Sequence, residues 1–273
     1  MSLLATKDLT IRFGGHVAVN AVTCAFQPGT LTAIVGPNGA GKTTYFNLIS
    51  GQLKASAGQV TLDGRDLSSL SASQRTRAGL GRAFQLTNLF PRLSVLENVR
   101  LAVQATREGP HRHGFNLWSI WTDHKALIQR ADEILQAVGM AAKENELVMN
   151  LPHGDQRKLE VALLMALESK VFMFDEPTAG MSAAEAPVIL NLIRKLKEDS
   201  SKTILLVEHK MDVVRELADR IIVLHNGSLV ADGEPADVIA SPIVQEAYLG
   251  VSAAPELTRG ALPPEVERQG EVL

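Results

Sequence analysis

Residues 36–43 read Gly-Pro-Asn-Gly-Ala-Gly-Lys-Thr, the pattern G-x-x-x-x-G-K-[ST] of loops that bind nucleotide phosphates. Glycines let successive backbone N–H groups turn towards phosphate oxygens, and the helix that follows adds the positive end of its dipole. Lys42 would reach the β- and γ-phosphates, and the Thr43 hydroxyl would bind Mg²⁺. An apolar strand at 31–35 and an apolar helix at 42–50 flank the loop, which argues against an accidental glycine-rich turn. The residues expected to contact the nucleotide phosphates are Gly36, Pro37, Asn38, Gly39, Ala40, Gly41, Lys42, Thr43 and Thr44.

Two adjacent acids, Asp175 and Glu176, follow the apolar run 171–174. Ligands of open α/β sheets bind beyond the carboxyl ends of parallel strands, so Asp175 is placed to hold the Mg²⁺ shell. Glu176 points in a different direction and could orient and deprotonate an attacking water. A solvated strand end is the alternative for the pair on its own, and the phosphate loop argues against it.

The hydrophobic pattern predicts an α/β fold with a parallel sheet, because strands and helices alternate along the second half of the chain. Ser94 and Glu97 have the spacing of a capping box at the start of a long helical region. The predicted strands are 9–13, 17–26 with an irregularity near Asn20, 31–35, 59–62 with a turn at Asp63-Gly64, 171–174, 203–207 and 221–224. The predicted helices are 42–50, a helical region from 94 to about 167, one ending near Lys197, and 211–217.

Composition excludes several classes of protein. The 273-residue chain has a formal net charge of −3, which gives no broad attraction to nucleic acid or anionic lipid. Cys24 is the only cysteine, so an internal disulfide is impossible, which fits a reducing cytoplasm. The first residues lack a signal-peptide pattern, and no stretch reaches the roughly 20 apolar residues needed to span a bilayer. Any work at a membrane would therefore need a partner.

A phosphate loop does not by itself separate kinases, GTPases and transport ATPases. Residues 209–212, His-Lys-Met-Asp, are superficially similar to the N-K-x-D element by which GTPases read guanine, but the first residue is His. Taken with Asp175, Glu176 and the loop, residues 1–250 instead resemble an ABC-transporter ATPase subunit. The resemblance implies ATP and Mg²⁺ as cofactors.

The resemblance also implies an architecture. A P-loop NTPase core with a RecA-like parallel sheet would carry an N-terminal antiparallel β region and an inserted α-helical subdomain at about 86–160. Residues 251–273, with three prolines, are predicted to form a flexible tail.

Further site residues follow from the same resemblance. Phe13 lies where the family stacks an aromatic ring on adenine, although taken alone it would be read as strand packing. Gln85 matches the glutamine that binds Mg²⁺ and links the attacking water to the membrane-facing helical region. His209 matches the switch histidine that contacts the γ-phosphate.

Residues 151–156, Leu-Pro-His-Gly-Asp-Gln, stand where the family has L-S-G-G-Q, which acts on ATP bound by the other subunit. Pro152, His153, Gly154 and Asp155 are therefore expected to contact nucleotide in trans. Pro152 removes the serine hydroxyl, and Asp155 either brings negative charge or caps a helix at 156–167. A working but weaker closed dimer is the expectation. Residues 178–182 match the loop that touches the partner, with Ser182 in place of the usual Asp.

Within the family, residues 13–15, 176–181 and 247–250 are similar to the ATPases of branched-chain amino acid importers. An insertion at 115–121, which holds both tryptophans, points the same way, either as an apolar surface or as core packing. The alternatives are a urea or short-amide importer, an exporter, a soluble ABC-type factor, and a structural subunit with a degenerate site. The implied partners are a second ATPase subunit, identical or related, transmembrane permease subunits and, indirectly, a substrate-binding protein. The implied location is the cytoplasmic face of the inner or plasma membrane.

Overall fold

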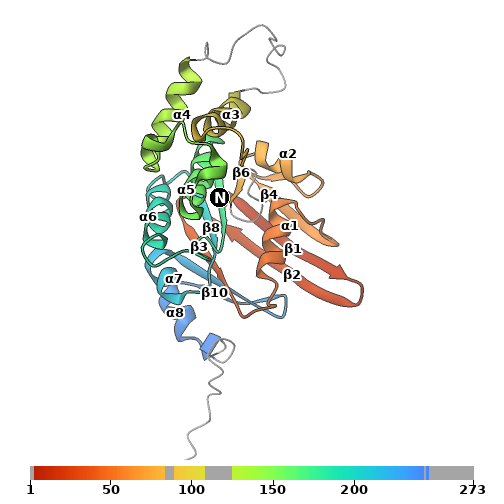
Figure 1. Cartoon of the computed structure of the whole chain (residues 1–273). Helices are drawn as coiled ribbons and strands as arrows, with labels where there is room; N and C mark the ends of the chain where they lie inside the picture. Colours follow the sequence, from red (N-terminus) through yellow and green to blue (C-terminus); the bar gives the residue numbers. More distant parts are fainter. Residues whose placement is uncertain (1–2, 84–88, 108–124, 243, 246–273) are drawn as a thin grey trace, which may run out of the picture.

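The computed structural model describes residues 3–83, 89–107, 125–242 and 244–245 (Figure 1). The strands are β1 (Leu4–Phe13), β2 (His16–Phe26), β3 (Leu31–Val35), β4 (Ala57–Leu62), β5 (Arg65–Asp66), β6 (Leu80–Ala83), β7 (Val171–Asp175), β8 (Thr203–Val207), β9 (Arg220–His225) and β10 (Ser228–Gly233). The α-helices are α1 (Lys42–Ser50), α2 (Ala72–Arg77), α3 (Val95–Arg107), α4 (Lys125–Ala137), α5 (His153–Ala166), α6 (Ala186–Lys197), α7 (Met211–Leu217) and α8 (Pro235–Ala240). In the part of the chain that is described, no helix has the length and apolar character to cross a membrane.

The central sheet has six strands in the order β10-β9-β3-β8-β7-β6. Neighbouring strands from β9 to β6 run parallel, and only β10 is antiparallel to its neighbour β9. The α/β class and the parallel sheet are confirmed. Strand β3 lies inside the sheet, between β8 and β9, so the loop that follows it opens at the centre of the carboxyl edge.

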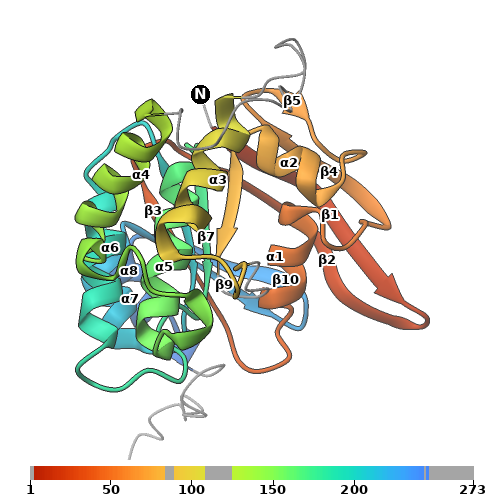
Figure 2. The ribbon, with the colours of Figure 1, turned by 45° about the horizontal axis from the view of Figure 1, so that its top comes forward.

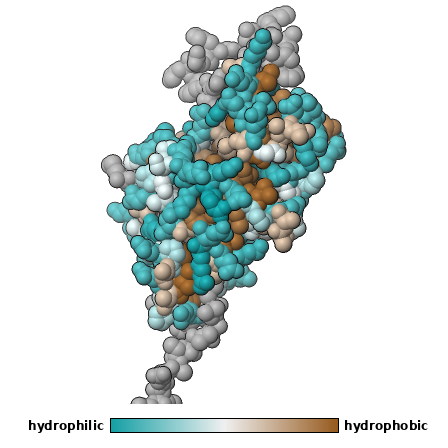
Figure 3. Space-filling view, turned by 90° about the vertical axis from the view of Figure 1, so that its left-hand side faces the viewer, coloured by the Kyte–Doolittle hydropathy of each residue, from teal (hydrophilic) through white to brown (hydrophobic). Residues whose placement is uncertain are grey.

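Successive side chains along each buried strand point to opposite faces of this sheet. In β7, Phe172 and Phe174 pack with α5 and α6, whereas Val171 and Met173 pack with α1 and the N-terminal strands. Figures 1 and 2 show α5 to α8 on one face, and α1 with a second sheet on the other. The outer face of α4, α6, α7 and α8 is mostly hydrophilic, with hydrophobic atoms in a broken band (Figure 3).

The second sheet is antiparallel, with strand order β2-β1-β4-β5. Its register shifts between the pairs Leu9–Val22 and Ile11–Val19, where Ala21 has a φ of 49°. This shift is a β-bulge, which gives the bulged strand an extra residue and bends it. The irregularity predicted near Asn20 is therefore confirmed, and it lies beside Ala18, whose carbonyl oxygen approaches Gly41 of the phosphate loop.

The helical region follows the sequence pattern at its start and departs from it later. Ser94 N donates to Glu97 Oε2 at 2.9 Å and Glu97 N donates to Ser94 Oγ at 3.1 Å, which confirms the capping box. The region from 94 to about 167 that the pattern predicts to be helical is interrupted between α4 and α5. There the chain forms two short 3₁₀ turns, at Ala141–Lys143 and Val148–Asn150, and Leu147 pairs with Ser94.

Candidate nucleotide-binding site

The phosphate loop leaves β3 in a conformation that only glycine adopts without strain. Gly36 has a φ of 153° and Gly41 a φ of 98°. A Cβ atom on Gly36 would lie 2.2 Å from the Leu224 carbonyl oxygen, and one on Gly41 would lie 2.5 Å from the Ala18 carbonyl oxygen. Neighbouring backbone therefore clamps the loop on both sides, and its glycines meet a packing requirement as well as a conformational one.

Lys42 is the first residue of α1, and its side chain folds back into the loop. Its Nζ donates to the carbonyl oxygens of Gly36 at 2.6 Å and Pro37 at 2.9 Å. Burial lowers the pKa of Lys42, while Glu176 and Asp175 act to raise it. The ammonium thus lies inside the curl of the loop, and Thr43 and Thr44 occupy the first turn of α1 directly behind it.

Asp175 and Glu176, adjacent at the end of β7, have separate partners. The buried Asp175 carboxylate accepts from Arg82 Nη2 at 2.9 Å. Burial raises the pKa of Asp175, and the Arg82 charge acts in the opposite direction. Glu176 has a φ of 50°, a strained value for a residue with a Cβ, and its Oε1 lies 2.6 Å from His209 Nε2. The two acids do point in different directions.

His209 follows β8 and is held at its backbone. Its N–H donates to Glu208 Oε2 at 2.7 Å, and Glu208 Oε1 accepts from the Thr178 hydroxyl at 2.8 Å. Glu208 and Thr178 are both buried, so this contact ties the loop after β7 to the loop after β8. The sequence reasoning missed this pair, although an acid directly between a buried strand and His209 is a visible signal.

Phe13 is exposed at the end of β1, with 51 % of its surface accessible. The alternative that it is ordinary strand packing is therefore wrong, and its ring is available to a ligand. Gln85 lies outside the described residues. So do the insertion at 115–121, residues 247–250 and the tail at 251–273.

Residues 152–155 form the start of α5, which begins at His153 with Pro152 as its N-cap residue. The prediction that Asp155 caps a helix at 156–167 is wrong. Asp155 lies in the first turn and is bound by two lysines, Lys143 at 2.6 Å and Lys158 at 2.8 Å. Its negative charge is therefore largely compensated within the chain.

Gly154 is packed against the loop that follows β7. A Cβ atom on Gly154 would lie 2.5 Å from Glu185 Oε1, while Glu185 Oε2 accepts from the backbone and the hydroxyl of Ser182. The segment at 178–182 and the start of α5 are thus neighbours.

The donor set suits Mg²⁺ bound together with nucleotide phosphates. A threonine hydroxyl at Thr43 and a buried carboxylate at Asp175 are hard oxygen ligands, which Mg²⁺ prefers. At Gly39, inside the phosphate loop, an added Cβ atom would have no other atom within 4 Å, so this part of the loop is open.

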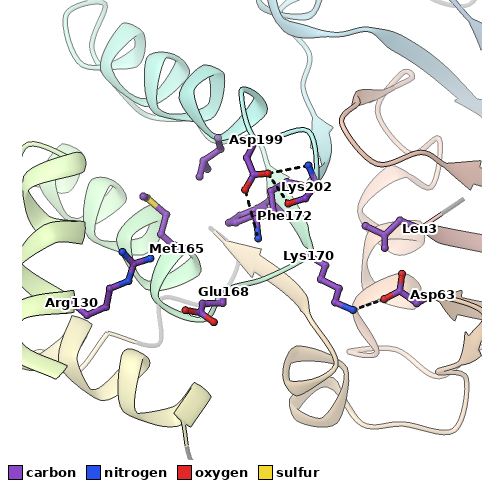
Figure 4. Close-up of a pocket in the computed structure, with 11 residues that line it drawn as sticks. Leu3, Asp63, Arg130, Met165, Glu168, Lys170, Phe172, Asp199 and Lys202 are labelled. Atoms are coloured by element: carbon purple, nitrogen blue, oxygen red, sulfur yellow. Dashed lines mark hydrogen bonds and ion pairs between the residues drawn. The ribbon is translucent and has the colours of Figure 1, made fainter. Parts of the chain in front are cut away.

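A separate cavity of about 620 Å³ lies at the opposite, amino edge of the sheet. Lys170 and Lys202 directly precede β7 and β8 and line it together with Phe172 (Figure 4). Lys170 pairs with Asp63 at 2.5 Å, and Lys202 lies 3.9 Å from Asp199. This cavity belongs to the junction between the core, the helical region and the N-terminal sheet, away from the carboxylates after β7.

Three loops converge at the carboxyl edge, those that follow the neighbouring strands β3, β8 and β7. They bring a phosphate loop, a histidine and a carboxylate pair together, which defines a nucleotide-binding cassette. Residues 19–179 match the model of the ABC transporter family, and residues 228–254 match that of the branched-chain amino acid ATP-binding cassette transporter. The chain belongs to the ABC transporter family of ATP-binding cassettes.

Named relatives are similar over almost their whole length. The high-affinity branched-chain amino acid transport ATP-binding protein LivG of Salmonella typhimurium is 37 % identical over 91 % of this chain and 98 % of its own. BraF of Pseudomonas aeruginosa, with the same description, is 34 % identical over 91 % of this chain and 98 % of its own. Among solved structures, the ADP conformation of MJ1267, an ATP-binding cassette of an ABC transporter, has a TM-score of 0.77 and 28 % identity. That match covers 92 % of this chain and 100 % of the other.

Proposed function

We propose that this chain hydrolyses ATP to drive an importer of branched-chain or other hydrophobic amino acids. The observation that carries the ATPase role is the meeting of the Lys42 loop with the Glu176–His209 pair at one edge of the sheet. Similarity to LivG and BraF over nine tenths of the chain supports the amino-acid branch. The chain would work at the cytoplasmic face of the membrane.

Each side chain would have a defined task. Lys42 would exchange two carbonyl oxygens for β- and γ-phosphate oxygens, which offer it full negative charge. Thr43, Asp175 and Gln85 would hold Mg²⁺, which would neutralise phosphate charge during hydrolysis. Glu176 would orient the attacking water and accept its proton, and His209 would hold Glu176 and contact the γ-phosphate. Phe13 would stack on the adenine ring.

A second cassette would complete each site. Residues 152–155 would contact ATP bound by the partner, using Gly154 and the N–H groups at the start of α5. The lysine pair on Asp155 removes the charge repulsion that the sequence suggested. ATP would favour the closed dimer only through its higher affinity for that state.

The permease would meet an exposed apolar patch formed by Phe90, Leu147 and Met149. Their exposed fractions are 55, 40 and 61 %. Backbone hydrogen bonds hold the two segments side by side, from Met149 N to Pro91 O at 3.0 Å and from Val148 N to Leu93 O at 3.1 Å. Exposed apolar side chains grouped in this way are typical of protein interfaces. Phe90 comes two residues after the segment 84–88, which contains Gln85.

The test is uptake of labelled substrates in cells that carry this chain as their only copy. Cells with Glu176→Gln should lose leucine-type uptake, while Glu198→Gln, an exposed acid at the end of α6, should retain it. If only urea uptake were lost, the chain would still be a transport ATPase, but the assignment to amino-acid import would be wrong. If all uptake survived in Glu176→Gln cells that contain normal amounts of the protein, the transport role itself would be wrong.

A further inference from the structure

Arg82 lies at the centre of a polar cluster that the proposed mechanism does not use. It is in β6, beside β7, and only 7 % of its side chain is exposed. Its Nη2 donates to Asp175 Oδ2 at 2.9 Å, and the Asp175 side chain is 3 % exposed. A buried guanidinium and a buried carboxylate thus compensate each other at the end of β7.

The same guanidinium also binds α1, the helix that begins inside the phosphate loop. Its Nη1 donates to Asn47 Oδ1 at 2.5 Å and to Ser50 Oγ at 2.9 Å. Its Cζ atom lies 5.4 Å from the centroid of the Phe46 ring. Arg82 therefore joins three parts of the site, namely the carboxylate after β7, the helix after the phosphate loop, and the strand that leads into residues 84–88.

Two cations compete to compensate one carboxylate. An ionised carboxylate removed from water needs a nearby positive charge. Arg82 supplies that charge when no metal is bound, and Mg²⁺ would supply a second one when nucleotide arrives with its metal. Because Arg82 already compensates the charge of Asp175, contact with Asp175 stabilises bound Mg²⁺ by less than it would if Arg82 were absent.

We propose that Arg82 is a positioning residue that holds the Asp175 carboxylate in place in the metal-free site, and so limits how strongly nucleotide binding depends on Mg²⁺. This inference rests on the proposed nucleotide site and concerns its metal dependence. Without Arg82, the metal-free state loses its only buried cation on Asp175 Oδ2 among the described contacts, whereas the Mg²⁺-bound state keeps the metal. The ratio of ATP affinity with Mg²⁺ to affinity without it should then rise.

A merely structural role makes a different prediction. If Arg82 only ties α1 to the sheet, its loss would weaken binding with and without Mg²⁺ by the same factor. Arg75 provides a matched control, because it is also buried and donates to α1, through the Leu48 and Ile49 carbonyl oxygens, both at 2.7 Å. It binds no carboxylate in the described site.

The experiment measures the affinity of a fluorescent ATP analogue, by titration, in Mg²⁺ and in EDTA. Arg82→Gln should raise the affinity ratio about tenfold over wild type, and Arg82→Lys, which keeps the charge, should raise it less. Arg75→Gln should leave the ratio unchanged even though it lowers the melting temperature. In an Asp175→Asn background, Arg82→Gln should no longer change the ratio.

An unchanged or lowered ratio in Arg82→Gln would overturn the proposal, as would an equal rise in Arg75→Gln. If Arg82→Gln does not fold, the Arg82→Lys ratio decides, and equality with wild type would count against the proposal. Failure of the wild-type chain to bind the analogue at all would instead refute the nucleotide site, so the two failures are distinguishable.

Discussion

Neighbouring side chains give two adjacent acids different tasks at the end of β7. Asp175 is buried against Arg82, whereas Glu176, one residue on, is turned towards His209 by a left-handed backbone conformation. Because a strained backbone persists only where its surroundings hold it, the Glu176 conformation is tied to the loops on either side. Two side chains of the same chemical type therefore have different surroundings, and the different roles proposed for them rest on those contacts.

Cys24 should be inert in the folded protein. Burial raises the pKa of this thiol to about 11, with Arg220 acting in the opposite direction. At pH 8 almost no thiolate would exist, whereas an unfolded chain has a cysteine pKa of about 8.5. A disulfide reagent such as DTNB should label almost no thiol in native protein and one thiol per chain in concentrated urea. Rapid native labelling would contradict the buried position in β2.

Asp155 should stabilise the fold in a pH-dependent way. Burial acts to raise the pKa of this acid, but hydrogen bonds and charges from Lys143 and Lys158 outweigh it, so the pKa is lowered. A depressed pKa gives stability that is full above the unfolded value of about 3.9 and is lost as pH falls through the folded value. Asp155→Asn should cost about 1 kcal/mol at pH 7 and progressively less below pH ~4.

The measurement for Asp155 is urea unfolding across pH. Asp132→Asn on α4 serves as the control, because the Asp132 carboxylate accepts from the neutral amide Nε2 of Gln136 at 3.1 Å, and it should cost a few tenths of a kcal/mol at most. A cost for Asp155→Asn that stayed constant down to pH ~3 would rule out the ion pairs as its cause.

At the scale of elements, the phosphate loop depends on backbone far away in sequence. Ala40 O accepts from Gly227 N at 3.0 Å, and Gly227 O accepts from Asn20 N at 2.8 Å. The bulge in β2 and the turn between β9 and β10 therefore hold the loop in shape before any nucleotide arrives. A loop that is already shaped loses less entropy on binding.

Gly36→Ala should abolish nucleotide binding and lower the free energy of unfolding by about 2–4 kcal/mol, because the new methyl group would overlap the Leu224 carbonyl. Gly64→Ala is the control. Gly64 has a φ of 77° but no atom within 4 Å of an added Cβ, so only about 1 kcal/mol and no binding should be lost. Fluorescent nucleotide titration and urea unfolding measure both. Equal losses in the free energy of unfolding at the two glycines would show that the positive φ, and not the overlap with Leu224, causes the loss.

Local pattern was enough to predict several elements to the residue. The ranges 31–35, 42–50, 203–207 and 211–217 agree with β3, α1, β8 and α7. No prediction was made for β6, β10, α2 or α8, although Ser71 and Gln74 at the start of α2 have capping-box spacing and do form one. These elements are four to six residues long, too short for a hydrophobic period to stand out.

The start of α5 and the Arg82 cluster could not be predicted for another reason. Asp155 has the propensity of an N-cap residue, but two lysines compete for its carboxylate and the helix begins earlier. The pairing of Arg82 with Asp175 depends on β6 lying beside β7, two strands separated by the whole helical region. A charged residue in a buried strand was the available signal.

For the whole molecule, the proposed function depends on two surface sites. The nucleotide site opens at the carboxyl edge of the sheet, and the apolar patch of Phe90, Leu147 and Met149 lies on the helical region. Motion of the helical region relative to the core would therefore move the apolar patch relative to the nucleotide site, and this is the coupling that a transport ATPase requires.

Charge in the apolar patch should uncouple the cassette from its permease. Phe90→Asp and Met149→Asp should prevent co-purification with the permease, because a charge replaces buried apolar contact. Both variants should still bind nucleotide and remain folded, since both side chains are exposed. Val188→Asp, at an exposed apolar position on α6, should assemble normally. Normal assembly of both patch variants would place the permease elsewhere.

The central place of β3 has a consequence for how the protein is made. The strand has β8 and β9 as its neighbours, and its loop is closed by Gly227, all of which are synthesised after the helical region. When only the first half of the chain has been synthesised, the G-x-x-x-x-G-K-[ST] segment is therefore present without β8, β9 and Gly227, which hold it in shape. Nucleotide binding can begin only after residue 227 emerges, so ATP cannot assist the early, co-translational steps of folding.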